Sequence, residues 1–332
     1  MKILVNNVKS TNSTLLVRLL KRIHRFPIEV IGSDVSDPGS IASSILVDEY
    51  IKSPSMNNET EYLVFLNEIY EKYKIDFLFV STDKEVRFVD RHKSEIRIPF
   101  FNPPSNTIAI FQDKLKATIA MNEIGVTIPQ IYSDLFGKEK VIFRKKRSVS
   151  SEGIYIADLS KMTYIENHFQ ADWFAQKYIS GTTYVVDVFA DKNGKPKLII
   201  PRKSIEVQKG SAFRSQVIKN EKVIETCKLI YSNYLIPGLS NIEFIENADG
   251  LHFIEINLRI GGSATAGIVA SFNYIEQFLD HFVNGKSLES LDTYMKCISW
   301  NSIVSRYYDE VIATDIQYSF PVDHKSNTQN DK

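Results

Sequence analysis

Cysteine and unbalanced charge are the two features that this sequence most clearly lacks. Its two cysteines, Cys227 and Cys297, lie far apart without histidine neighbours at metal-ligand spacing, which excludes a disulfide scaffold and a zinc knuckle. Lys plus Arg and Asp plus Glu each number 40, so the net charge is zero and no global field recruits a polyanion. These absences argue against a nucleic-acid partner and favour a reducing cytoplasm.

Long hydrophobic runs are also missing. The apolar stretch at residues 3–5 is too short for a signal peptide, and no later run approaches the length of a membrane span. We therefore expect a soluble cytoplasmic protein without a membrane partner. A chain of 332 residues is too long for one ordinary core and suits two or three subdomains with a cleft between them.

Apolar strands alternate with helical patterns in the first hundred residues. The expected strands are residues 3–5, 29–31 and 77–80, and the expected helices are 15–23 and 62–73. This alternation predicts a parallel, helix-covered sheet. The carboxyl ends of its strands would bring Asn6, Asp34 and Asp83 to one edge, where each could face a ligand or serve as a plain turn or cap residue.

A different pattern begins near Thr107. A helix over residues 111–124 is closed by Gly125 and Pro129, and polar connections join the strands that follow. The expected strands are residues 141–144, 153–156, 173–179, 183–190, 197–201 and 204–207, and the expected helices are 221–235 and 274–283. The second half is therefore predicted to be antiparallel α+β, with a polar, disordered C-terminal tail.

The most informative segment is 241–257, in which two alternating stretches surround a turn. If residues 248–250 form a three-residue loop with Gly250 in a left-handed bulge, Asn247 pairs with Leu251. That pair sets the register of the whole hairpin.

Counting from this turn places Glu243 opposite Glu255, with Asn241 and Asn257 on the same face. The other face would carry the apolar residues Ile242, Phe244, Ile254, Ile256 and Leu258. Like charges directly opposite destabilise a strand pair by up to about 1 kcal/mol, which a hard divalent cation relieves. The sequence thus predicts Mg²⁺ on Glu243, Glu255 and Asn257. A solvated strand face that shares its charges with nearby Lys or Arg is the alternative.

Basic residues and glycines occur near this hairpin and in an earlier loop. Arg259 continues the alternation, and Gly261-Gly262-Ser263 gives a turn where backbone could approach an anion. Arg144 ends a strand and precedes the loop 145–152, whose basic residues and hydroxyls, Ser150 and Ser151 among them, could fold over a triphosphate. A basic surface loop is the alternative.

The run Gln176-Lys177-Tyr178-Ile179 connects two strand segments before Gly181. Such a crossing can offer backbone groups to an adenine edge, although a mere strand connection has the same pattern.

The order of these motifs resembles the ATP-grasp superfamily, especially short proteins similar to half of a carbamoyl-phosphate synthase large subunit, over residues 1–285. The motifs that carry it are Asp113-Lys114, Gly125-Val126-Thr127-Ile128-Pro129, Arg144 with Gly153, the 176–181 run and the 243–259 hairpin. The resemblance implies a preATP-grasp parallel-sheet domain followed by two α+β subdomains that clasp ATP. Its boundaries would be 1–106 for the preATP-grasp domain, 107–182 for the small subdomain, 183–318 for the large subdomain and 319–332 for the tail.

The resemblance also implies roles for single residues. Its phosphate contacts would be Lys114 and Arg144, its adenine hinge Gln176, Lys177, Tyr178 and Ile179, its magnesium ligands Glu243, Glu255 and Asn257, and its phosphoryl-stabilising residue Arg259. The sequence departs from the family pattern at three places. The phosphate loop 148–151 has no glycine, Lys177 replaces the hinge acid, and Thr183 replaces the ribose-binding acid.

We hypothesise an ADP-forming carboxylate–amine ligase that uses ATP and Mg²⁺, or Mn²⁺, on a small carboxylate. Lys114 and Arg144 would neutralise the moving phosphoryl group. Arg259 and Arg202 are candidates for holding the carboxylate or stabilising the transition state, and either could instead be a structural ion-pair partner. Two alternatives are a nucleotide-binding regulatory protein with weakened catalysis and an enzyme that forms carbamoyl or carboxyphosphate. The oligomeric state is open, with a homodimer as one arrangement.

Overall fold

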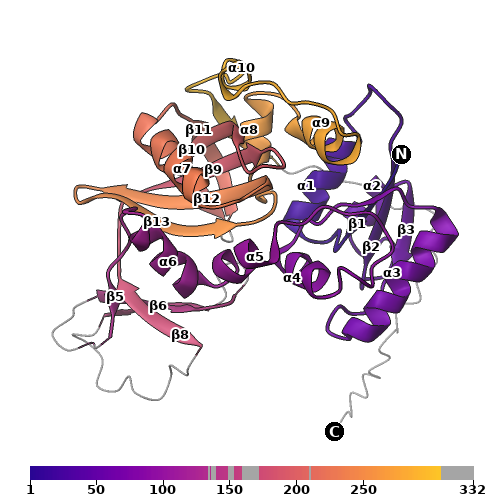
Figure 1. Ribbon diagram of the computed structural model, residues 1–332, viewed down its shortest axis with the longest axis horizontal. Coiled ribbons are helices and arrows are strands. Elements are labelled where there is room, and N and C mark those ends of the chain that lie inside the picture. The colour runs from indigo at the N-terminus through magenta and orange to yellow at the C-terminus, as the bar shows by residue number, and fades with distance from the viewer. Residues whose placement is uncertain (134, 136–139, 149–152, 159–171, 209–210, 308–332) are drawn as a thin grey trace, which may run out of the picture.

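Three β-sheets organise the computed structural model, which describes residues 1–133, 135, 140–148, 153–158, 172–208 and 211–307. The first sheet and its helices lie on one side of the molecule and the other two sheets lie on the opposite side, with α5 (Ser105–Phe111) between them (Figure 1). The predicted order of a parallel-sheet unit followed by antiparallel α+β units is confirmed. The tail predicted at 319–332 falls outside the described residues.

The first sheet is parallel and has the strand order β3-β2-β1-β4. Its strands are β1 (Lys2–Asn6), β2 (Glu29–Asp34), β3 (Glu49–Lys52) and β4 (Phe77–Leu78), and its helices are α1 (Thr11–Leu20), α2 (Ser43–Leu46), α3 (Glu59–Tyr73) and α4 (Asp83–Arg91). Asn6 accepts a hydrogen bond from Ser33 Oγ at 2.6 Å, and Asp34 accepts from the backbone of Lys9 at 3.1 Å. Asn6 and Asp34 therefore organise the edge of the sheet, while Asp83 has a different partner, described below.

The second sheet is small and antiparallel, with the order β5-β8-β6-β7. Its strands are β5 (Ile131–Tyr132), β6 (Lys140–Lys145), β7 (Ile154–Asp158) and β8 (Trp173–Lys177). The helix expected at 111–124 is present as α6 (Lys114–Glu123) but begins three residues later, and the preceding α5 was not predicted. Asp113 separates them: its side chain accepts from the backbone N–H groups of Leu115 and Lys116, both at 3.1 Å, and so caps α6.

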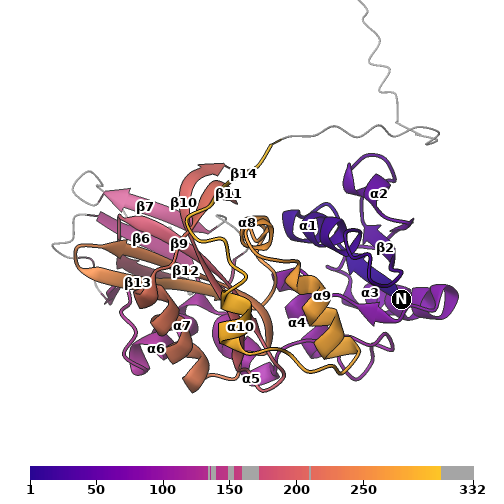
Figure 2. The ribbon, with the colours of Figure 1, turned by 90° about the horizontal axis from the view of Figure 1, so that it is seen from above.

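The third sheet has six strands in the order β13-β12-β9-β10-β11-β14. Its strands are β9 (Thr182–Ala190), β10 (Pro196–Gln208), β11 (Ser211–Val217), β12 (Gly238–Asn247), β13 (Gly250–Asn257) and β14 (Ile303–Ser305). The helices of this part are α7 (Glu221–Asn233), α8 (Thr265–Val269), α9 (Tyr274–Phe278), the π-helix η2 (Leu279–Val283) and α10 (Leu291–Met295) (Figure 2). The two strands expected at 197–201 and 204–207 are one continuous strand, β10.

One apolar core joins the first sheet to the third. It contains Val5 and Leu16 from the first unit together with Phe278 and Leu279 from the α9–η2 segment, all at most 4% exposed. The rings of Phe79 and Phe278 lie with their centroids 4.8 Å apart. This shared core fixes α1 against the third sheet, and Val86 of α4 belongs to a second core with Val186 and Ile242 of that sheet. Residues at the N-terminal ends of both helices can therefore take part in one site. Within the described ranges, every helix is too short or too polar to form a membrane span.

Candidate active site

A cavity of about 440 Å³ lies between the structural units. It is lined by α1, α6, strands of the small sheet and strands of the large sheet. The predicted site residues that line it are Lys114, Arg144, Gln176, Lys177, Ile179, Thr183, Glu243, Glu255, Asn257 and Arg259. Arg202 and Tyr178 do not line it, and Ser150 and Ser151 fall outside the described residues. The cavity therefore collects residues from three motifs that are far apart in the sequence.

Glu243 on β12 pairs directly with Glu255 on β13, and Asn241 pairs with Asn257, as the alternation predicted. The predicted turn is wrong, because Asn247 pairs with Gly250 and leaves a two-residue loop.

A β-bulge at Ile254 shifts the register of the strand pair by one residue and so compensates for the shorter turn. Phe244 pairs with Phe253 and Glu243 with Glu255, so Ile254 has no cross-strand partner. Phe253, rather than Ile254, is fully buried in the core, and Ile254 lines the cavity. The bulge thus keeps the two glutamates opposite each other.

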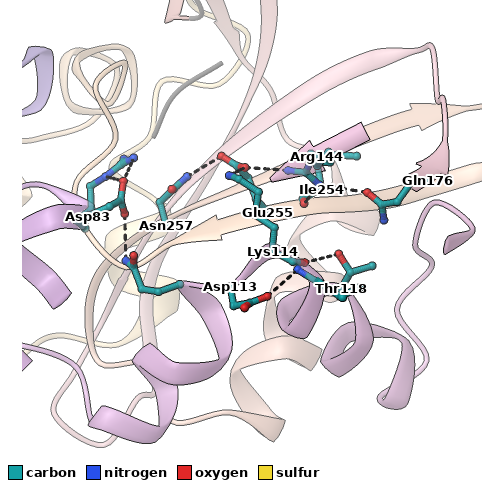
Figure 3. Close-up of polar contacts among 12 residues, drawn as sticks. Asp83, Asp113, Lys114, Thr118, Arg144, Gln176, Ile254, Glu255 and Asn257 are labelled. Carbon is teal, nitrogen blue, oxygen red and sulfur yellow. Dashed lines mark hydrogen bonds and ion pairs between the residues drawn. The ribbon is translucent and has the colours of Figure 1, made fainter. Parts of the chain in front are cut away.

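Glu255 is held by three partners (Figure 3). Its Oε2 accepts from Lys114 Nζ at 2.5 Å and from Arg144 Nη2 at 3.0 Å, and its Oε1 accepts from Asn257 Nδ2 at 3.2 Å. Arg144 Nη1 also donates to the carbonyl of the bulged Ile254 at 2.9 Å. Burial alone would raise the pKa of Glu255, but Lys114 and Arg144 outweigh burial and lower it to about 2. Glu255 is therefore ionised at neutral pH.

Glu243 has the opposite electrostatic environment. Among the described residues, no hydrogen bond or ion pair engages its carboxylate, and burial together with the facing Glu255 raises its pKa to about 7. The side-chain oxygen of Asn257 likewise has no hydrogen-bond partner among the described residues. The side-chain nitrogen of Asn257 donates to Glu255. An unpartnered carboxylate, a second carboxylate and an amide oxygen form the donor set that Mg²⁺ or Mn²⁺ accepts.

The protein supplies only part of an octahedral shell. No group of three or more His, Cys, Asp or Glu side chains that could hold a metal occurs in the described part of the chain. The residues present therefore fit a cation that completes its coordination with water and phosphate oxygens, as Mg²⁺ does in nucleotide sites.

One end of the cavity is apolar. Its walls include Pro129, Ile142 and Ile154, and Ile179 closes it from the segment after β8. Gln176 is 1% exposed, and its Nε2 donates to the Pro129 carbonyl at 3.4 Å. Such a slot suits a flat aromatic ring.

Two residues of the predicted hinge have partners beside this slot. Lys177 lines the cavity while its Nζ lies 3.5 Å from Asp249 Oδ2. The ring of Tyr178 packs under Lys140 Nζ at 4.0 Å and so turns away from the cavity.

Arg259 is oriented by a residue from the first unit. Its Nε and Nη2 donate to Asp83 Oδ2 at 3.1 and 2.8 Å, and Asp83 Oδ1 accepts from Gln112 Nε2 at 3.2 Å. Asp83 is the first residue of α4, where its charge also complements the helix dipole. The ion pair therefore links the parallel sheet to the end of β13 and aims Arg259 at the cavity.

Arg202 is fully buried and forms a bidentate ion pair with Asp187, at 2.7 and 2.9 Å. Its Nη1 donates to Ser263 Oγ at 3.2 Å, and Asp187 also accepts from Asn241 Nδ2 at 3.1 Å. This geometry favours the structural ion-pair alternative for Arg202.

The sequence-based reasoning missed Thr11 and Asn12, which line the end of the cavity near Arg259. They belong to a Ser/Thr/Asn cluster that predicts a helix cap, and Ser10 does cap α1. A Cβ on Gly262 would lie 2.7 Å from Asn12 Oδ1, so these segments, 250 residues apart, approach at a glycine. In the sequence, only the pair Gly261-Gly262 indicated that another part of the backbone could approach closely here.

A family model described as ATP-grasp in the biosynthetic pathway with Ter operon matches residues 169–299. No curated protein matches the chain.

Three solved structures share the fold of nearly the whole chain. The biotin carboxylase domain of Hydrogenobacter thermophilus 2-oxoglutarate carboxylase, solved with MgADP, ADP and bicarbonate, has a TM-score of 0.67 at 16% identity and covers 91% of this chain and 73% of its own. N5-carboxyaminoimidazole synthetase from Staphylococcus aureus, complexed with ADP, has a TM-score of 0.65 at 16% identity and covers 87% of this chain and 78% of its own. L-amino acid ligase from Bacillus licheniformis has a TM-score of 0.61 at 14% identity and covers 84% of this chain and 73% of its own.

Substituting Arg202 by Met should strongly destabilise the protein, because Asp187 would remain buried without its counter-charge. We expect a loss of about 3–5 kcal/mol in the free energy of unfolding, measured by urea denaturation. The control is Arg214→Met, which breaks the half-exposed pair with Glu206 (3.4 Å) and should cost at most about 1 kcal/mol. An Arg202→Met protein as stable as the control but without turnover would show a catalytic role instead.

Divalent-metal affinity should rise with pH between 6 and 8. The raised pKa of Glu243, about 7, means that a cation competes with a proton on this carboxylate at acid pH. We expect Mn²⁺ affinity to be about tenfold lower at pH 6 than at pH 8 in calorimetric titrations, with proton release at the lower pH. Glu243→Gln should bind more weakly and lose this dependence. Equal affinity of the unsubstituted protein at both pH values would contradict the assignment.

Proposed function

We propose that this chain is a member of the ATP-grasp superfamily and an ATP- and Mg²⁺-dependent ligase that activates a small carboxylate as an acyl phosphate for attack by an amine. The observation that carries the proposal is the meeting of opposed Glu243 and Glu255 with Lys114 and Arg144 in one cavity. We assign the preATP-grasp domain to 1–106 and the two ATP-grasp subdomains to 107–182 and 183–318.

ATP would bind with its adenine in the apolar slot beside Gln176 and Ile179 and its phosphates toward Lys114 and Arg144. The side chains of Lys114 and Arg144 already form ion pairs with Glu255 and are only 12% and 4% exposed. They are therefore desolvated and pre-oriented. Their N–H groups can contact phosphate oxygens once a divalent cation balances the glutamates. Mg²⁺ held by Glu243, Glu255 and Asn257 would supply charge neutralisation for the terminal phosphates.

The chemistry then follows from the charges around the cavity. A carboxylate oxygen of the substrate attacks the γ-phosphorus, the bond to the β,γ-bridging oxygen breaks, and ADP leaves with that electron pair. Arg259, fixed by Asp83, stabilises the negative charge on the transferring phosphoryl group, and Lys114 and Arg144 stabilise the leaving phosphates. An amine adds to the acyl carbon, loses a proton and expels inorganic phosphate.

The structural relatives support this class of reaction without selecting the acid. Two of them are described with ADP bound, one together with magnesium and bicarbonate, and a third is named for joining amino acids. The likeness to carbamoyl-phosphate synthase stays a prediction from the sequence motifs.

Glu255→Gln should abolish most turnover. Removing this charge releases Lys114 and Arg144 and takes one ligand from the metal, so we expect kcat to fall at least about 100-fold. The assay measures ADP and phosphate release with Mg·ATP and a panel of small carboxylates. Unchanged turnover in Glu255→Gln would contradict the assigned role.

The matched control is Glu246→Gln, on the same hairpin but outside the cavity, where Glu246 lies 3.6 Å from Lys222. It should keep turnover within about twofold. Tight Mg·ATP binding without ADP formation from any acid would favour the alternative of a nucleotide-binding regulatory protein.

A further inference from the structure

We propose that Arg87, Arg91 and Arg147 form a second anion site, which takes a phosphoryl group outside the catalytic cavity. The three side chains line a pocket of about 140 Å³, here called the arginine pocket, between α4, α5 and the segment that follows β6. Helices α4 and α5 lie side by side there (Figure 1). The site goes beyond the proposed function, because neither ATP nor the acid substrate is assigned to it.

Arg87 is the most enclosed of the three arginines. The side chains of Arg91 and Arg147 are 51% and 65% exposed, whereas Arg87 is half-buried and its Nη1 donates to the neutral side chain of Gln112 at 2.5 Å. Burial lowers the pKa of the Arg87 guanidinium; Asp83 opposes this effect, and the like charges of Arg91 and Arg147 add to it. A dianion among the three guanidinium groups would relieve their mutual repulsion.

The protein partners of the outer two arginines engage part of each guanidinium. Arg91 donates to Glu59 through Nε, at 3.3 Å, and through Nη2. Arg147 Nε lies 3.8 Å from Asp113 Oδ2. A guanidinium carries five N–H donors in a planar fork, which matches the oxygens of a phosphoryl group. These two contacts therefore hold the side chains beside the pocket and leave donors that can turn toward a ligand.

The pocket also contains a carboxylate, which already has partners. Asp90 accepts from Ser105 Oγ at 2.5 Å and lies 3.5 Å from Lys93 Nζ. Its charge is thus shared with a lysine as well as with the arginines.

The volume of the pocket indicates the size of its ligand. Pockets that enclose a drug-sized molecule measure about 300–1,000 Å³. A space of about 140 Å³ therefore suits a single phosphoryl group rather than a whole nucleotide. Because two of the three arginines are more than half exposed, the rest of a phosphate ester could extend into solvent.

Gln112 connects the arginine pocket to the catalytic cavity. Its Oε1 accepts from Arg87, and its Nε2 donates to Asp83 Oδ1 at 3.2 Å. Asp83 in turn holds Arg259. An anion that takes N–H groups of Arg87 would weaken the first contact of this chain, so occupancy of the pocket should loosen Arg259. This consequence rests on the proposed function, whereas the anion site itself does not.

The first experiment measures phosphate binding while the catalytic cavity is filled. Inorganic phosphate is titrated calorimetrically into protein saturated with Mg²⁺ and a non-hydrolysable ATP analogue, and glycerol 3-phosphate is titrated in parallel. We expect saturable binding that chloride at the same ionic strength does not displace. Either ligand supports the site: tighter binding of glycerol 3-phosphate would identify a phosphate ester as its occupant, and tighter binding of inorganic phosphate would identify the free ion.

Two variants place this binding in the arginine pocket. Arg147→Gln changes an exposed side chain and should leave the packing of α4 intact, and Arg87→Lys keeps the charge but loses the planar fork. We expect each to weaken phosphate binding at least about tenfold. The matched control is Arg22→Gln, at an exposed arginine outside the pocket, which should stay within about twofold because exposed charges are screened. Phosphate affinity that is unchanged in both pocket variants, or displacement by chloride, would overturn the site.

A second experiment tests the link to Arg259. ADP release is measured at saturating Mg·ATP with and without inorganic phosphate. We expect phosphate to lower kcat at least about threefold more in the unsubstituted protein than in Arg147→Gln. An equal response of the two proteins would overturn the link and leave the site standing.

The outcomes separate this inference from the proposed function. ADP release with no acid substrate would overturn the ligase function and the link to Arg259 with it. If the ATP analogue does not bind either, phosphate titration of the nucleotide-free protein decides the site, because Arg147→Gln and Arg87→Lys should still weaken binding relative to Arg22→Gln.

Discussion

The opposition of Glu243 and Glu255 on neighbouring strands is the constraint on which the rest of the site depends. A bulge at Ile254 keeps the two carboxylates in register and exposes a carbonyl that anchors Arg144. Lys114 and Arg144 stabilise Glu255 as an anion, while burial and the facing charge of Glu255 raise the pKa of Glu243 to about 7. In the proposed function, the side chains of Lys114 and Arg144 and the two carboxylates would receive a polyphosphate together with its divalent cation.

The second requirement is the rigid union of the parallel sheet with the large antiparallel sheet. The shared core around Phe79 and Phe278 holds α1, and the second core that contains Val86 holds α4, beside the glycine turn that follows β13. Without that packing, Asp83 could not orient Arg259, and Thr11 and Asn12 would not reach the cavity. In the proposed function, the first unit would contribute to the site through the N-terminal ends of α1 and α4, without supplying a metal ligand or a phosphate-binding cation.

Much of this arrangement could be predicted from sequence because it depends on short-range periodicity. The alternation in residues 241–257 gave the facing glutamates correctly, even though the predicted three-residue turn was wrong, because turn and bulge shift the register by one residue in opposite directions. The break between α5 and α6 was missed, since the apolar pattern runs through the capping Asp113.

Contacts between residues of different structural units could not be predicted from short-range periodicity. Asp83 beside Arg259 has no local signal, because the pair forms only when the first sheet and the third sheet assemble. Asp187 and Arg202 lie on the adjacent strands β9 and β10 but not directly opposite each other, so alternation along the strands does not single out the pair. The most direct test of the central claim is a crystal structure with Mn²⁺ and a non-hydrolysable ATP analogue, using the anomalous signal of manganese. The account predicts a peak within coordinating distance of both Glu243 and Glu255, with the phosphates beside Lys114 and Arg144. Manganese bound elsewhere, with these four side chains still paired only to one another, would contradict it.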